Sequence, residues 1–216
     1  MRTAFLDIDG TLVEDGLWSV LIRQLLAEGL GDRPILEDCL DALDNPERSG
    51  TAALIKGIPT AFMNLTPALL FDVTERAWKQ AVLLPSTLDL ARVLHENDVA
   101  TVLISGAPQQ LADRIGEIFS TSDVHACTMI PGMDHFLTTM ESPEAKAELV
   151  HRHGGDLSRS LAIGNGHNDI GMLSAVGHPI AIEPSDRLRA AALANEWPTT
   201  DRHGLMQCVK SVLDLQ

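Results

Sequence analysis

Two aspartates lie one residue apart near the start of the sequence, directly after a short apolar run. Asp7 and Asp9 are followed by Gly10 and Thr11, where the chain must turn. Because side chains alternate along a strand, both carboxylates would point the same way at the strand's end. Paired carboxylates repel each other, and a hard cation such as Mg²⁺, which prefers oxygen ligands, relieves that repulsion. The stretch indicates a metal site, although a plain strand entering an Asp-Gly turn shows the same pattern.

Three later stretches carry groups suited to a phosphate. Ser105 and Gly106 follow an apolar run and are expected just before a helix, whose unpaired amides would bind a phosphate. Lys146 is expected on a helix, where it could supply a fixed positive charge. A further short strand is followed by Asn165, Asn168 and Asp169. Carboxylates for a metal, donors for a phosphate and a lysine together predict phosphoryl transfer.

Apolar runs and helical periodicities alternate along most of the chain. Strands are expected at residues 3–8, 99–104, 125–130, 161–163 and 179–182, with a hairpin or loop at 133–140. Helices are expected at residues 87–97, 109–119, 142–154, 169–176, 185–195 and 205–213. This alternation predicts an α/β fold with a parallel sheet covered by helices on both faces. In such a sheet ligands bind beyond the carboxyl ends of the strands, where all the polar stretches fall.

Residues 16 to 84 show helical patterns only. Helices are expected at 17–30, from Asp32 to Asn45, at 51–56 before Gly57, and from Thr66 to about residue 84. The simplest account is a helical cap domain inserted after the first strand. We therefore predict a core domain at residues 1–15 and 86–216 and a cap domain at residues 16–85.

Composition limits the partners. The 30 acidic and 16 basic residues leave a formal net charge of −14, which argues against nucleic acid or an anionic membrane. The three cysteines are too few and too widely spaced for a disulfide framework. No signal peptide is expected at the N-terminus, and no apolar run is long enough to span a bilayer. We expect a cytoplasmic protein, monomeric or homodimeric, that acts on a small phosphorylated metabolite.

The four polar stretches resemble the ordered motifs of the haloacid dehalogenase superfamily. The matching residues are 7–11, 105–106, Lys146 and 164–169. The helical insertion and the stretch Leu54-Ile55-Lys56-Gly57-Ile58-Pro59 are similar to the phosphoserine-phosphatase-like branch. The resemblance covers nearly the whole chain, and its strength lies in the order and spacing of the motifs. It implies a Rossmann-like core with a helical cap, and a Mg²⁺-dependent phosphomonoesterase that forms an aspartyl-phosphate.

The resemblance also implies catalytic roles. Asp7 would attack phosphorus and bind Mg²⁺. Asp9 would protonate the leaving alcohol and then activate the hydrolytic water, which suits one group that donates and later accepts a proton. Its main-chain carbonyl would also reach the metal. Lys146 would offset the charge between Asp7 and the phosphate.

The remaining motif residues would bind the phosphate and the metal. Ser105, as a further catalytic residue, and Gly106 would hold phosphate oxygens, and Asn168 would contact the phosphate. Asn165 and Asp169 would complete the metal site, the latter by orienting the metal's surroundings.

The sequence departs from the family pattern in two ways. Asn165 stands where the family usually has Asp; its amide oxygen could still bind Mg²⁺ more weakly, or it could only support a turn. Gly16 and Thr51 stand where phosphoserine phosphatases have a Glu for the substrate amine and an Arg for its carboxylate, while Glu14 and Asp15 are out of register. We therefore predict a phosphatase that does not prefer phosphoserine.

Two other functions remain open. The same chemistry could transfer phosphate to another acceptor, as a phosphotransferase or mutase. A non-catalytic module that binds a phosphorylated ligand is favoured only by Asn165. Dehalogenase chemistry does not need Asp9 as an acid, so the pair of Asp7 and Asp9 favours a phosphate substrate.

Residues outside the motifs are interpreted more simply. His125 shares a strand face with Cys127, but no second ligand pair accompanies them, so a zinc site is not expected there. His153 lies near a helix end, where its charge would complement the helix dipole, with a metal role as the alternative. Trp18 and Phe71 are interpreted as helix packing, with a place in the substrate pocket as the alternative.

Overall fold

The computed structural model describes residues 2–44, 46–130, 132–138 and 142–214, with the main chain alone at 46–53 and 137–138. Its strands are β1 (Thr3–Leu6), β2 (Ala100–Pro108), β3 (Val124–Met129), β4 (Phe136–Thr138), β5 (Leu161–Gly164), β6 (His178–Ile182) and β7 (Thr199–Thr200). They form one sheet in the order β4-β3-β2-β1-β5-β6-β7. All neighbouring strands are parallel except β3 and β4. The predicted parallel α/β sheet is confirmed.

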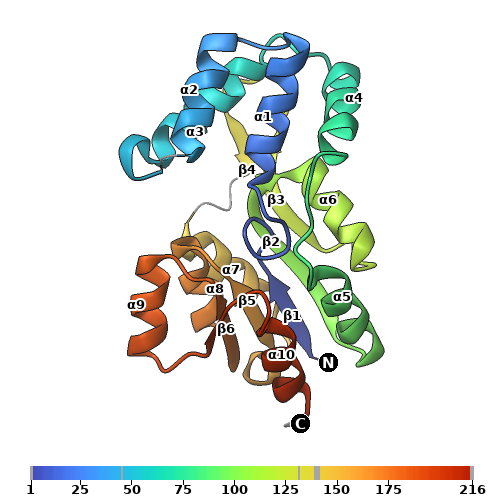
Figure 1. Cartoon of the computed structure of the whole chain (residues 1–216), viewed down its shortest axis with the longest axis vertical. Helices are drawn as coiled ribbons and strands as arrows, with labels where there is room; N and C mark the ends of the chain where they lie inside the picture. The colour runs from blue at the N-terminus through green and yellow to red at the C-terminus, as the bar shows by residue number, and fades with distance from the viewer. Residues whose placement is uncertain (1, 45, 131, 139–141, 215–216) are drawn as a thin grey trace.

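Helices precede and follow the strands as the alternation predicts (Figure 1). They are α1 (Leu17–Glu28), α2 (Arg33–Asp44), α3 (Pro46–Phe62), α4 (Pro67–Trp78), α5 (Thr87–Glu96), α6 (Gln109–Ile118), α7 (Pro143–His153), α8 (Ile170–Ser174), α9 (Asp186–Ala194) and α10 (Leu205–Asp214), with the 3₁₀ turns η1 (Leu157–Arg159) and η2 (His167–Asp169). Within the described ranges, no single helix has the length and apolar character needed to cross a membrane.

Successive side chains of the central strands point to opposite faces of the sheet, and helices bury both faces. Phe5 and Val102 belong to one core, which includes buried residues of α7, α8 and α9. Leu6 and Leu103 belong to the other, which includes residues of α5, α6 and α10. The second core continues into helices α1 to α4, so these helices pack on the sheet domain through a shared apolar interior.

Helices α1 to α4 form the group at the top of Figure 1, at the end of the sheet opposite the N-terminus. The chain enters and leaves this group through two adjacent segments, since Val13 and Leu83 form an antiparallel bridge. The described residues between 17 and 78 contain no strand. The boundaries predicted near residues 15 and 85 fall beside this bridge and stay a prediction.

Two predicted helix ends in this region are wrong. Helix α3 continues through Gly57 and Pro59 instead of ending at residue 57. A Cβ on Gly57 would lie 2.6 Å from the Cys39 sulfur, so the glycine allows α2 and α3 to pack closely and does not end the helix. Helix α4 ends at Trp78, well before residue 84, because the returning chain runs extended: the Leu84 amide donates to the Leu12 carbonyl at 2.9 Å.

Candidate active site

Asp7 lies directly beyond β1, at the centre of the sheet, and only 4% of its surface is exposed. Its amide donates to the Ile163 carbonyl at 3.0 Å, which extends the pairing of β1 with β5 and fixes the main chain. The Thr11 hydroxyl donates to Asp7 Oδ2 at 3.1 Å, and Lys146 Nζ donates to Asp7 Oδ1 at 2.7 Å. Both carboxylate oxygens therefore have fixed partners, and the side chain is held in one orientation.

Lys146 connects the first motif to the fourth. It lies on α7, is fully buried, and also donates to Asp169 Oδ1 at 2.6 Å. The other oxygen of Asp169 accepts from the amides of Asn165 and Gly166 at 2.9 and 2.8 Å. Asp169 thus uses both oxygens to hold Lys146 and the 165–166 turn. This arrangement suits a residue that orients the metal's surroundings through its neighbours.

A glycine makes room for this carboxylate. A Cβ on Gly164 would lie 2.5 Å from Cγ of Asp169, closer than such atoms approach in proteins. The glycine at the end of β5 therefore lets the Asp169 side chain lie directly against the main chain.

The buried charges change one another's titration. Burial raises the pKa of Asp7 to about 6, the neighbouring Asp169 adds to this rise, and Lys146 opposes it. For Lys146, burial lowers the pKa, but the charges of Asp169 and Asp7 together outweigh that effect and raise it. The lysine is therefore a permanent cation, whereas an ionised Asp7 is costly unless further positive charge is present.

Asp9 lies two residues after Asp7 and is held by α1. Its Oδ1 accepts from the Leu17 amide, at the start of α1, at 2.9 Å. The carboxylate is thus oriented by one of the N–H groups that have no partner inside the helix.

Ser105 and Gly106 depart from their predicted local structure. Strand β2 runs to Pro108 with a shift of register after Ile104, and α6 begins only at Gln109. The predicted helix start at residue 109 is confirmed, whereas the predicted strand end at residue 104 is wrong, because pairing with β3 resumes at Pro108. Ser105 is nonetheless fully buried, and its hydroxyl accepts from the Ala107 amide at 3.2 Å.

Trp18 joins α1 to the segment of Ser105 and Gly106. Its indole Nε1 donates to the Gly106 carbonyl at 2.8 Å, and its ring makes edge contacts with Phe62 and Phe136 at centroid distances of 6.1 and 5.6 Å. The helical periodicity around Trp18 indicated only burial, because no local pattern reports a hydrogen bond across 88 residues. Phe71, interpreted as helix packing, is instead 58% exposed.

One cavity, of about 180 Å³, collects most of the predicted site. The polar residues that line it are Asp7, Asp9, Ser105, Gly106, Asn165 and Asn168. The apolar ones are Trp18, Leu43, Leu54, Ile55, Ile58 and Phe136. The two remaining predicted residues, Lys146 and Asp169, lie buried beneath Asp7.

The oxygen atoms in this cavity suit Mg²⁺. Asp7, Asp9 and Asn165 line it together, and Mg²⁺ is commonly bound by one or two carboxylates while retaining several waters. The described chain contains no group of three or more His, Cys, Asp or Glu residues placed to hold a metal. Such a site would therefore need the amide oxygen of Asn165 or main-chain oxygens in addition to its carboxylates.

Asn165 lies close to the first motif because Gly10 has no side chain. Gly10 has a φ of +73°, and a Cβ there would lie 2.0 Å from Asn165 Nδ2. The amide group of Asn165 is thus packed against the main chain that follows Asp9. Both interpretations of Asn165, as a metal ligand and as support for a turn, stay predictions.

Several charged side chains in or near the helical group α1 to α4 pair outside the cavity. Glu14 pairs with Arg202 at 3.1 Å, and Asp15 with Arg23 at 3.6 Å. Arg76 pairs with Glu28. None of these is among the described residues that line the cavity. Lys56 does not line it either, and the side chains of Arg48 and Thr51 lie outside the described part of the chain.

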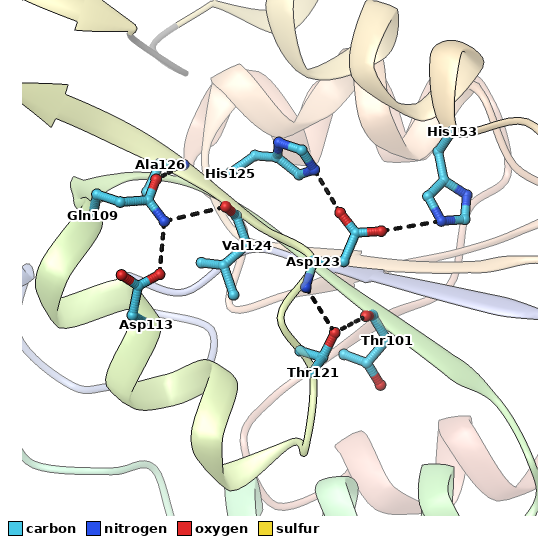
Figure 2. Close-up of polar contacts among 9 residues, drawn as sticks. All are labelled: Thr101, Gln109, Asp113, Thr121, Asp123, Val124, His125, Ala126 and His153. Carbon is cyan, nitrogen blue, oxygen red and sulfur yellow. Dashed lines mark hydrogen bonds and ion pairs between the residues drawn. The ribbon is translucent and has the colours of Figure 1, made fainter.

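Two histidines that seemed unrelated in the sequence meet at one carboxylate (Figure 2). Asp123, just before β3, lies 2.6 Å from His125 Nε2 and 3.3 Å from His153 Nε2. His153 also makes an edge contact with Phe5. Asp123 and His153 border a different pocket, beside the start of β2, so this cluster is separate from the cavity that Asp7 and Asp9 line. The three cysteines form no disulfide, as expected.

Comparison with known proteins agrees with this geometry. The haloacid dehalogenase-like hydrolase family matches residues 4–174. The chain is 36% identical over 114 residues to the "Inhibition of morphological differentiation protein" of Streptomyces azureus, an alignment that covers 49% of this chain and 40% of that protein. It is 26% identical over 200 residues to a phosphoserine phosphatase of Streptomyces coelicolor, covering 88% of this chain and 46% of that protein. The chain thus spans less than half the length of these curated relatives.

A solved structure supports the fold. A protein of unknown function from Bordetella pertussis Tohama I superimposes with a TM-score of 0.75 at 20% identity, covering 93% of this chain and 98% of that one. The family match spans the first strand, the helical group, β2, α7 and the 164–169 turn, which are the segments that build the cavity. The chain belongs to the haloacid dehalogenase-like hydrolases.

Proposed function

We propose that this protein is a Mg²⁺-dependent phosphatase that hydrolyses a small organic phosphomonoester through an aspartyl-phosphate on Asp7. The observation that carries the proposal is the buried Lys146, which contacts Asp7 and Asp169 beneath a cavity that also contains Asp9. A buried cation next to a fixed carboxylate suits a nucleophile that must approach an anionic phosphate.

In the first half of the reaction, a carboxylate oxygen of Asp7 attacks phosphorus. The bond from phosphorus to the leaving oxygen breaks, and Asp9 gives that oxygen its proton, so the alcohol departs neutral. Ser105 and Gly106 hold the phosphate oxygens in the cavity, and Asn168 lies beside them. Lys146 offsets the negative charge that accumulates around Asp7.

In the second half, a water molecule attacks phosphorus and transfers its proton to Asp9. The bond between phosphorus and the Asp7 oxygen breaks, which releases inorganic phosphate and restores the Asp7 carboxylate. The Leu17 amide, which bonds Asp9 Oδ1, holds the side chain so that Asp9 can serve in both halves.

The Asp7 carboxylate, the Asp9 main-chain carbonyl and the Asn165 amide oxygen would hold Mg²⁺. When bound, the cation would neutralise charge on the phosphate and on Asp7. Since Asn165 brings no charge, we propose weaker metal binding than a third carboxylate would give. Asp7, Asp9 and Asn165 support this proposal because all three line the cavity.

We also propose that phosphoserine is not the preferred substrate. Gly16 and Thr51 occupy the positions at which the family's phosphoserine phosphatases hold the amine and the carboxylate. Gly16 has no side chain to offer, and Glu14 and Asp15 each have an arginine partner.

Phosphate release from an aryl phosphate tests the proposed activity. The assay is run with Mg²⁺, with chelator in its place, and with the Asp7→Asn protein. We expect release with Mg²⁺ and none in the other two cases, because one removes the cation and the other the nucleophile.

Other outcomes distinguish the competing functions. Equal release from Asp7→Asn would exclude the aspartyl-phosphate. Phosphate appearing on an added alcohol in place of free phosphate would identify a phosphotransferase. Tight binding of phosphomonoesters without any turnover would identify a binding module.

A further inference from the structure

The described side chains that α1, α2, α3 and β4 contribute to the cavity are all apolar. We call the following residues the apolar wall: Trp18 of α1, Leu43 of α2, Leu54, Ile55 and Ile58 of α3, and Phe136 of β4. The catalytic carboxylates and Ser105 line the same cavity from the ends of the sheet strands. A phosphate bound at the carboxylates would therefore place its leaving group against the apolar wall.

Among the described residues, the apolar wall offers no partner for a charged leaving group. The only charged residues among those that line the cavity are Asp7 and Asp9, which are acidic and lie at the phosphate end. A carboxylate or an ammonium group on the leaving group would lose its hydration against the hydrocarbon of the wall. An uncharged, apolar leaving group loses nothing by entering and gains from burial.

Two contacts hold the wall in place next to the phosphate-binding segment. The Trp18 ring is anchored by its hydrogen bond to the Gly106 carbonyl and by its packing on Phe136. Ile58 is 2% exposed and belongs to the continuous apolar interior of the cap. The wall is therefore preformed, so the substrate does not have to order it on binding.

The rim of the wall has an apolar group left partly uncovered. Ile55 lines the cavity and is 39% exposed, one of few large apolar side chains with this exposure in the described chain. The cavity volume of about 180 Å³ lies below the roughly 300–1,000 Å³ typical of sites for drug-sized ligands. The space suits a phosphate with one ring or a short chain, which would cover Ile55.

We propose that the substrates are phosphomonoesters of small, uncharged, apolar alcohols, with the alkyl or aryl group bound on the apolar wall. This inference rests on the proposed phosphatase function and adds the substrate class. It predicts that kcat/KM increases with the apolar area of the leaving group, whereas a site without a preferred leaving group would show no such order.

A homologous series of esters tests the substrate class. Ethyl, propyl and butyl phosphate have leaving groups of similar reactivity, so differences in kcat/KM report binding of the chain. We expect kcat/KM to rise about fourfold for each added methylene until the cavity is filled. Phosphoserine and phosphoethanolamine, whose leaving groups are charged, should fall at least about tenfold below propyl phosphate. A flat series, or a preference for either charged ester, would overturn the inference.

Binding of the matching alkylphosphonates separates this inference from the proposed function. These compounds have a phosphorus–carbon bond that the proposed chemistry does not cleave, so thermal stabilisation of the protein measures binding alone. Stabilisation that increases from ethyl- to butylphosphonate without turnover of any ester would refute the phosphatase and keep the substrate class. Turnover without any dependence on chain length would refute the substrate class and keep the phosphatase.

Two variants test whether Ile55 of the apolar wall contacts the leaving group. Ile55→Arg adds a cation at the rim, and we expect the ratio of kcat/KM for butyl phosphate over phosphoserine to fall at least about tenfold. Met63→Arg is the matched control, because Met63 is similarly exposed, at 45%, lies just beyond the same helix and does not line the cavity. Its ratio should match the unmodified protein. Equal ratios in both variants would show that Ile55 does not face the leaving group.

Discussion

Lys146 Nζ lies 2.7 Å from Asp7 Oδ1, although 139 residues separate them in the sequence. The lysine is fully buried and Asp7 nearly so, which makes this pair the electrostatic centre of the candidate site. Lys146 also bonds Asp169, so a single ammonium group serves two carboxylates.

Replacing this lysine should damage both stability and activity. Lys146→Met leaves Asp7 and Asp169 buried without their cation, and breaking such a pair costs on the order of 3–5 kcal/mol of unfolding free energy. Phosphate release should be lost as well. Urea unfolding gives the first quantity and the phosphate assay the second.

The control for this variant is Lys210→Met, an exposed lysine on α10. Surface substitutions of this kind stay within about 0.5 kcal/mol. If the two variants unfolded at the same urea concentration, the buried pair would not contribute to stability.

The raised pKa of Asp7 predicts a pH-dependent stability in the metal-free protein. Its pKa rises from the usual 3.8 to about 6, so between these values the folded state binds a proton that the unfolded state has lost. Stability from this group therefore falls as pH rises through that interval, by on the order of 3 kcal/mol in total. Asp7→Asn lacks this titration.

The comparison to make is urea unfolding of the two proteins in chelator from pH 4 to pH 7. The unfolding free energy of the unmodified protein should decrease relative to Asp7→Asn over this range. Titrating groups that do not interact with Asp7 cancel in the difference. Two curves that stay parallel would mean that Asp7 titrates normally.

Asn165→Asp should strengthen metal binding. A carboxylate at position 165 would add a negative charge beside Asp7 and Asp9, which lowers the stability of the metal-free protein by like-charge repulsion. Mg²⁺ relieves that repulsion, so the rise in Tm on adding Mg²⁺ should be larger in the variant. The half-saturating Mg²⁺ concentration for phosphate release should fall. An unchanged Mg²⁺ response would remove Asn165 from the proposed metal site.

Gly10→Ala should affect the site more than its backbone strain alone explains. Gly10 has a φ of +73° and Gly29 a φ of +68°, so an alanine at either position adopts a left-handed conformation that costs roughly 1–2 kcal/mol. A Cβ at Gly29 meets nothing within 4 Å, whereas one at Gly10 lies 2.0 Å from Asn165 Nδ2.

Gly29→Ala is therefore a control with the same strain and no clash. It should lower Tm and leave phosphate release and its Mg²⁺ dependence intact. Gly10→Ala should lower Tm and also raise the Mg²⁺ requirement, because Asn165 must move. Matching Mg²⁺ responses in the two proteins would contradict the proposed role of this contact.

Much of the fold follows from local patterns. The apolar runs before Asp7 and before Ser105 became the central strands, and the helix starts expected at Thr66 and Ser142 are capped by those side chains at 3.2 Å. Such features could be predicted because a cap or an alternating run acts within a few residues. The motif residues were found in the same way, by type, order and spacing.

Other features depend on contacts between distant segments. Gly57 read as a helix stop, yet packing against Cys39 keeps α3 helical through it. The second long strand was expected to end at residue 104, yet pairing with β3 carries β2 to Pro108. In both cases tertiary packing outweighed the local preference.

The sequence by itself determined the chemical groups of the site and the alternating elements that carry them. The tertiary structure alone decided that Lys146 bridges Asp7 and Asp169, that Trp18 bonds the Gly106 carbonyl, and that His125 and His153 meet at Asp123. It also gathered residues from three helices and a strand into the apolar wall. These contacts have no local signature, because they arise only where burial of the shared core brings remote segments together.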